Sequence, residues 1–163
     1  MKTLLIMRHA KASPDGAAGG DLARPLSPRG LKTAPRVGAQ LREAGLTPDR
    51  VLASPSVRTL ETARAVSAEC HFLGPIAALD SLYLAEPRAY VAALARLPRE
   101  VLRPLVVGHN PGLEQLITLL TGRGEHLNPG ALAVVDVELA DWTELSAETH
   151  ATLRALWRPN EAD

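Results

Sequence analysis

Two histidines each follow directly after an apolar run that is typical of a buried strand. Arg8 and His9 end a run that begins at Leu4, and His109 follows the run 105–107 after one glycine. The carboxyl ends of parallel strands line the ligand crevice of an open α/β sheet. If both strands are central and parallel, we expect both imidazoles at the same edge of the sheet.

A second arginine belongs to this edge by the same reasoning. Arg58 lies in the first turn of the helix predicted after the strand Arg50–Ala53, within the segment Ser54-Pro55-Ser56-Val57-Arg58. A guanidinium is always charged and its donors match phosphate oxygens, and helix N-termini add further N–H groups. The sequence therefore predicts a pocket of two imidazoles and two guanidiniums that binds a phosphoryl group.

Other kinds of phosphate site are disfavoured. Cations in this pocket would repel a metal ion, and the common zinc spacings are absent, so we expect neither metal nor cofactor. No Gly-x-x-x-x-Gly-Lys-Ser/Thr loop appears, which disfavours a P-loop NTPase. Cys70 lacks the following arginine that a cysteine phosphatase needs, and no paired aspartates follow a strand as in metal-dependent aspartyl phosphatases.

Alternating apolar runs and helix-like stretches predict the elements that position these residues. Strands are expected over Thr3–Met7, Arg50–Ala53, Pro75–Leu79, Leu102–Val107 and Ala131–Leu139, with an ambiguous one near Ala151–Trp157. Helices are expected from Ser27 to about Ala44, over Ser56–Glu69 and Pro87–Leu97, and from Gly112 to about Leu120. Pro35 should kink the first helix or break it in two. The alternation predicts an α/β three-layer sandwich with a mostly parallel central sheet, as a single domain over residues 1–163.

Composition narrows the functional class. The chain is 46% hydrophobic, which is enough for a packed core, and its 18 Lys+Arg balance its 18 Asp+Glu. Zero net charge argues against a nucleic-acid binder. A lone cysteine, Cys70, excludes a disulfide framework within the chain. The apolar run near the start is too short for a signal peptide and nothing approaches a membrane span, so we expect a cytoplasmic protein.

Four segments together resemble a known family. They are Leu5–Lys11, Arg24–Gly30, Leu52–Ala63 and Val106–Pro111, and they look like the histidine phosphatase superfamily. The short length and the Arg-Pro-Leu-Ser segment are most similar to its SixA-type phosphohistidine phosphatase branch. The resemblance runs in order from residue 3 to about residue 139.

This resemblance implies a phosphoglycerate-mutase-like fold and no metal. It also implies that His9 is the nucleophile and is phosphorylated during turnover, while Arg8, Arg58 and His109 bind the phosphoryl oxygens. One departure is Ala10, where the best-known signature of the family has glycine.

The proton donor to the leaving group is left open. Related enzymes often use a carboxylic acid from the loop after the third strand, where this chain has Asp80 and Glu86. We favour Asp80 because it directly follows the predicted strand, and the SixA-type branch also allows that no acid is present. A phosphohistidine substrate tolerates that absence, because imidazole is a better leaving group than an alkoxide.

Three functions compete at this point. The first is a phosphatase acting on a phosphohistidine-bearing phosphorelay or phosphocarrier protein, because a short chain leaves little to build a lid. The second is a small-molecule phosphomonoesterase, which a deep, closed site and a well-placed Asp80 would favour. The third, a phosphate-binding module without turnover, ranks last because every predicted catalytic position is filled.

Overall fold

The computed structural model describes residues 1–159, and for Ala17 its backbone only. Its strands are β1 (Lys2–Arg8), β2 (Arg50–Ala53), β3 (Ile76–Ala78), β4 (Pro104–Gly108), β5 (Leu132–Val137) and β6 (Ala151–Trp157). Its helices are α1 (Pro28–Glu43), α2 (Val57–Cys70), α3 (Pro87–Ala95) and α4 (Gly112–Thr121). Short 3-10 turns include η2 (Asp21–Ala23) and η3 (Asp80–Leu82).

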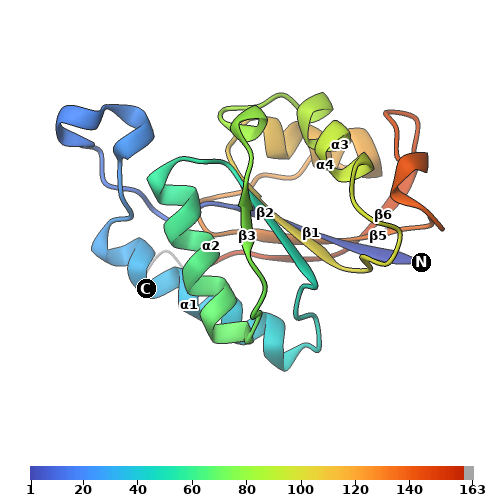
Figure 1. Cartoon of the computed structure of the whole chain (residues 1–163), viewed down its shortest axis with the longest axis horizontal. Helices are drawn as coiled ribbons and strands as arrows, with labels where there is room; N and C mark the ends of the chain where they lie inside the picture. Colours follow the sequence, from blue (N-terminus) through green and yellow to red (C-terminus); the bar gives the residue numbers. More distant parts are fainter. Residues whose placement is uncertain (160–163) are drawn as a thin grey trace.

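All six strands form one sheet in the order β3-β2-β4-β1-β5-β6 (Figure 1). The first four strands in this order pair in parallel, and β5 and β6 add an antiparallel edge. The central strands β1 and β4 are buried on both faces, which explains why they appear in the sequence as continuous apolar runs. The prediction of a mostly parallel sheet is confirmed.

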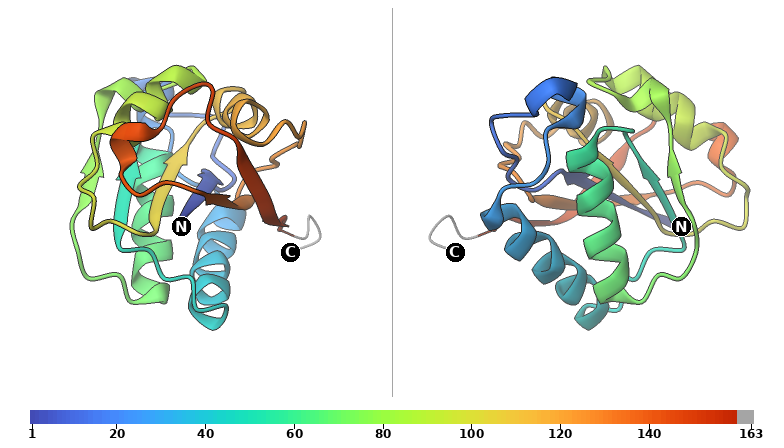
Figure 2. Two further views of the ribbon diagram at one scale, coloured as in Figure 1. Left: turned by 90° about the vertical axis from the view of Figure 1, so that its right-hand side faces the viewer. Right: turned by 60° about the vertical axis from the view of Figure 1, so that its left-hand side comes forward.

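Helices cover both faces of the sheet (Figures 1 and 2). On one face, α1 and α2 pack over a cluster that includes Leu5, Met7 and Val107. On the other face, α3 and α4 pack over Leu4 and Ile6 and their neighbours. Alternate residues of β1 therefore enter opposite cores, as the two-residue period of a strand requires. This is the three-layer sandwich that the sequence predicted.

Of the two predicted effects of Pro35, a break is wrong, because α1 is one element from Pro28 to Glu43, and a kink stays a prediction. The hydroxyl of Ser27 caps its start by accepting the Gly30 N–H at 3.2 Å. A proline inside a helix removes the hydrogen bond to the carbonyl four residues earlier. Here that carbonyl belongs to Leu31, an exposed residue of the helix.

The ambiguous C-terminal segment is a strand. β6 pairs with β5 along its whole length, with an irregularity in register between Val134 and Val135. Before it, the Trp142 side chain is fully buried and its indole N–H donates to the Val101 carbonyl at 2.7 Å. Among residues 1–159, no helix has both the length and the apolar character needed to cross a membrane.

Candidate active site

Pairing of the two central strands places the two histidines side by side. In the parallel register of β1 with β4, Arg8 lies opposite Gly108, so His9 and His109 leave the sheet at the same edge. The His9 N–H donates to the Gly108 carbonyl at 3.1 Å. The ring centroids of the two imidazoles are 5.4 Å apart and both side chains are buried.

The first turn of α2 brings Arg58 to the two imidazoles. Its buried guanidinium donates from Nη2 to His109 Nδ1 at 3.4 Å. Thr62, one turn further, ties this helix to the loop after β1: its hydroxyl accepts the Ala10 N–H at 3.1 Å and donates to the Arg58 carbonyl at 2.7 Å. The helix and the strand end therefore hold each other in place.

Arg8 completes the group of four predicted residues. Its Nη1 donates to the Leu127 carbonyl at 3.0 Å, which orients the guanidinium. Its charge contributes to lowering the pKa values of both His9 and His109. Burial lowers the pKa of Arg8 itself, while the carboxylate of Glu114 opposes that effect.

Each of the two guanidiniums has an unused donor. Nε of Arg8 and Nε of Arg58 are buried and have no hydrogen-bond partner among the residues that the structure describes. Buried N–H groups are rarely left unpaired in folded proteins, and an orphaned one points to a missing ligand or water. Phosphoryl oxygens are acceptors that suit both groups.

His9 presents a free lone pair at Nε2. Its Nδ1 lies 2.8 Å from the Ala10 carbonyl oxygen, which can only accept, so Nδ1 has the hydrogen. Burial lowers the pKa of His9 to about 4, and the charges of Arg58, Arg8 and Arg24 act in the same direction. The imidazole is therefore neutral at pH 7, with Nε2 available as a nucleophile.

His109 is fixed from three sides. Its Nε2 lies 2.8 Å from the Ser54 hydroxyl, and its backbone N–H donates to the Tyr90 hydroxyl at 3.2 Å. Since the Arg58 guanidinium can only donate, Nδ1 of His109 accepts and Nε2 has the hydrogen. Burial lowers the pKa of His109 to about 3, with His9 and Arg58 contributing, so this imidazole is also neutral.

We predict that His9 stays neutral from pH 7 down to about pH 5, unlike an ordinary histidine. Burial and the guanidiniums disfavour the imidazolium, so protonation occurs near pH 4, not near 6.5. An NMR titration of the His9 Cε1–H signal, assigned from a His9→Ala variant, measures this pKa. A titration midpoint of the His9 signal near pH 6.5 would contradict the prediction.

The two candidate acids lie on the segment between β3 and α3. Asp80 opens η3 with its side chain exposed, and among residues 1–159 it makes no hydrogen bond or ion pair with the four residues above. Glu86 is also exposed, at the N-cap of α3. The 3-10 turn instead leads to Tyr83, whose ring meets the His109 ring edge-on at 5.6 Å.

Asp21 is the carboxylate at this site, and sequence reasoning missed it. Its Oδ2 lies 3.0 Å from Arg58 Nη2 and accepts a hydrogen bond from the Tyr83 hydroxyl, while its carbonyl accepts from Arg58 Nη1 at 2.7 Å. Hydrogen bonds from Tyr83, Arg24 and Arg58 hold the pKa of Asp21 well below its usual range. The available signal was the Asp21-x-x-Arg24 spacing just before the Arg-Pro-Leu-Ser segment.

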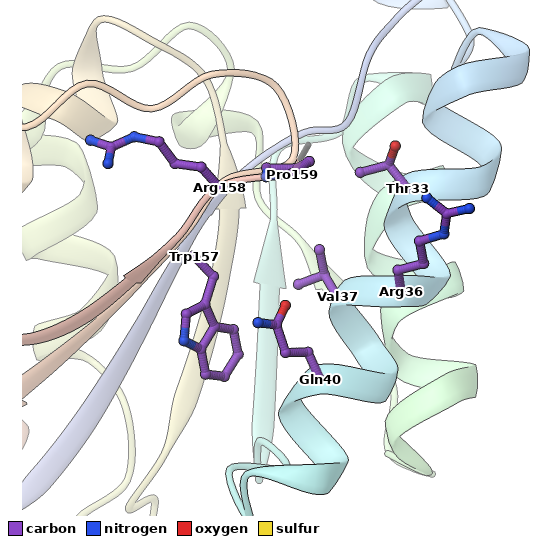
Figure 3. A pocket seen from close by; sticks show the side chains of 7 residues that line it. All are labelled: Thr33, Arg36, Val37, Gln40, Trp157, Arg158 and Pro159. Atoms are coloured by element: carbon purple, nitrogen blue, oxygen red, sulfur yellow. The ribbon is translucent and has the colours of Figure 1, made fainter. Parts of the chain in front are cut away.

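A separate pocket of about 220 Å³ lies between α1 and the end of β6 (Figure 3). In this view Trp157 faces Val37 and Gln40, while the Arg158 side chain points away from them. None of the four predicted residues lines this pocket. Residues 1–159 also contain no group of three or more His, Cys, Asp or Glu side chains arranged to hold a metal ion.

Comparisons with known proteins show the family of this chain. The family model for the histidine phosphatase superfamily (branch 1) matches residues 4–83. The uncharacterized protein ML1117 of Mycobacterium leprae is 33% identical over 123 residues, which are 72% of this chain and 73% of that protein. SixA from Nakamurella multipartitia has 29% identity and a TM-score of 0.85, covering 97% of this chain and 96% of that one.

A second solved structure is similar over nearly the whole chain. It is the protein histidine phosphatase SixA in complex with tungstate, with 26% identity, a TM-score of 0.82 and coverage of 96% of each chain. This chain belongs to the histidine phosphatase superfamily and is of its SixA type.

Proposed function

We propose that this histidine phosphatase removes the phosphoryl group from a phosphohistidine of another protein, through a covalent intermediate on His9. The observation that supports it most is the neutral His9 imidazole with a free Nε2, beside two guanidiniums whose Nε donors have no partner. A nucleophile next to an empty set of anion-binding donors is what phosphoryl transfer requires.

In the first step, His9 Nε2 attacks phosphorus while the bond from phosphorus to the substrate nitrogen breaks. The electron pair of that bond goes to the leaving ring, whose other nitrogen is protonated, so the ring departs as neutral imidazole. Arg8, Arg58 and His109 face the charge on the equatorial oxygens, an electrostatic stabilisation that often dominates such reactions. The bound phosphoryl group also favours protonation of His109, which offsets the burial that keeps it neutral in the free protein.

In the second step, water attacks the phosphohistidine on His9. The bond from phosphorus to Nε2 breaks, its electron pair returns to His9, and inorganic phosphate leaves. The hydrogen bond from Nδ1–H to the Ala10 carbonyl stays in place throughout, so the same tautomer is ready for the next cycle. Neither step needs a metal ion, since the guanidiniums supply the positive charge.

One further observation and the chemistry of the leaving group support this proposal. The similar SixA chain binds tungstate, an oxyanion with the shape of phosphate. A phosphohistidine ring that is protonated on its remote nitrogen leaves as neutral imidazole, so this substrate needs no separate proton donor.

The test compares substrates with the purified protein. We expect a higher kcat/KM for a phosphohistidine-bearing phosphorelay or phosphocarrier domain than for any member of a panel of metabolite phosphates, and no loss on addition of a chelator. A metabolite hydrolysed with a higher kcat/KM than the protein substrates would replace this proposal with the phosphomonoesterase. The absence of any hydrolysis would favour a phosphate-binding module.

A further inference from the structure

Asp21 places a fixed negative charge on the solvent side of the candidate active site. Its side chain is 45% exposed, whereas the Arg58 side chain that it contacts is 2% exposed. It belongs to η2, which lies beside the N-terminal end of α2 (Figures 1 and 2). A substrate whose phosphoryl group contacts Arg58 therefore lies close to this carboxylate.

A carboxylate at this position is unfavourable for most phosphate esters. The phosphoryl group is itself anionic, and like charges a few ångströms apart repel each other. The repulsion grows when the rest of the substrate has further negative charge, as in a phosphorylated carboxylic acid. The same carboxylate attracts a substrate whose neighbouring group is cationic or has an N–H to donate.

Phosphohistidine has such a group. When phosphorus is bonded to one ring nitrogen, the other ring nitrogen can be protonated, and the ring is then an imidazolium. On cleavage the electron pair of the bond from phosphorus to nitrogen goes to the ring. The product is neutral imidazole, which retains the proton on its remote nitrogen. No separate acid is needed, provided that the imidazolium form is stabilised.

We propose that Asp21 selects the leaving group: its carboxylate accepts the remote N–H of the phosphohistidine ring and disfavours substrates with additional negative charge. This inference rests on the proposed function and specifies the substrate chemistry of the same site. It makes Asp21 a hydrogen-bond acceptor and not the missing acid.

The neighbours of Asp21 agree with an acceptor role. Arg24 Nε donates to Asp21 Oδ1 at 2.9 Å and Tyr83 donates to Oδ2, so both oxygens are oriented. These contacts and Arg58 stabilise the ionised form and hold the pKa of Asp21 far below neutrality. At pH 7 the group has no proton to donate, but it has lone pairs to accept one N–H more.

The test measures kcat/KM for N-phosphoimidazole and for 4-nitrophenyl phosphate, whose leaving group has no N–H. In Asp21→Asn, the ratio of the first value to the second should fall about tenfold or more, the loss expected for one hydrogen bond to a charged group. Asp21→Glu should restore part of the ratio. Asp15→Asn, which changes an exposed aspartate of the same loop, should leave the ratio as in the wild type.

Each other outcome overturns the inference. If both kcat/KM values fall by the same factor in Asp21→Asn, the carboxylate only holds Arg58 in place. If both kcat/KM values rise, the Asp21 carboxylate competes with the phosphoryl group of the substrate for the Arg58 guanidinium. In either case the proposed function stands, provided that the wild type hydrolyses N-phosphoimidazole. A wild type that hydrolyses 4-nitrophenyl phosphate but not N-phosphoimidazole would overturn both proposals.

Discussion

Alanine in place of His9 is expected to lower kcat for phosphohistidine hydrolysis by a factor on the order of 10⁴ or more. In the proposed reaction the imidazole forms a bond to phosphorus, so no neighbouring group can compensate for its loss. Arg8, Arg58 and His109 would still bind the anion. The variant should therefore retain binding of phosphate or tungstate while losing turnover, which isothermal titration and a phosphate-release assay measure separately.

The covalent intermediate gives this prediction a direct readout. Rapid quenching in base of wild type mixed with a ³²P-labelled substrate should trap label on the protein, and His9→Ala should trap none. His150→Ala is the matched control, because it removes an exposed imidazole that has no part in the proposed site. Near-normal turnover or undiminished labelling of a folded His9→Ala variant would contradict the assignment of His9 as nucleophile.

The local sequence pattern was sufficient to predict the part of the candidate site that lies at the ends of strands and helices. Apolar runs identify β1 and β4 as buried strands, and parallel pairing then brings their ends together, which places His9 beside His109. The helix predicted to follow β2 begins at Val57 with Ser56 as its N-cap, which places Arg58 in the first turn as expected. These inferences succeed because strand burial and helix capping depend on residues close in sequence.

The loop from residue 10 to residue 25 follows no such pattern. Contacts between side chains and the backbone hold it, for example Arg24 Nη1 to the Ser13 carbonyl at 2.9 Å and the Ser27 hydroxyl to the Lys11 carbonyl at 3.0 Å. Residues that make such contacts do not recur at a regular spacing in the sequence, so Asp21 was not predicted. Tyr83 was missed for the same reason, since it follows the short turn η3 and only the folded chain brings its ring to His109.

Removal of the Arg58 guanidinium should have the second largest effect. Arg58→Ala is expected to lower kcat/KM by roughly 10²–10³, the range found when one preorganised donor to a developing negative charge is lost. The loss has two sources, because this guanidinium is proposed to bind the phosphoryl group and also donates to His109 Nδ1. Steady-state kinetics with 4-nitrophenyl phosphate, alongside thermal unfolding to verify the fold, measures it.

Arg58→Lys separates charge from geometry. Lysine retains the positive charge but not the planar fork that reaches both the Asp21 carbonyl and its carboxylate, so it should recover only a small part of the lost rate. Arg64→Ala, an exposed arginine on the same helix, tests whether loss of any positive charge on α2 has this effect. Since Arg58 is buried and Arg64 is not, only Arg58 can exclude water from the anion that it contacts. A rate in Arg58→Lys equal to that of the wild type would show that charge alone suffices and that the fork has no role.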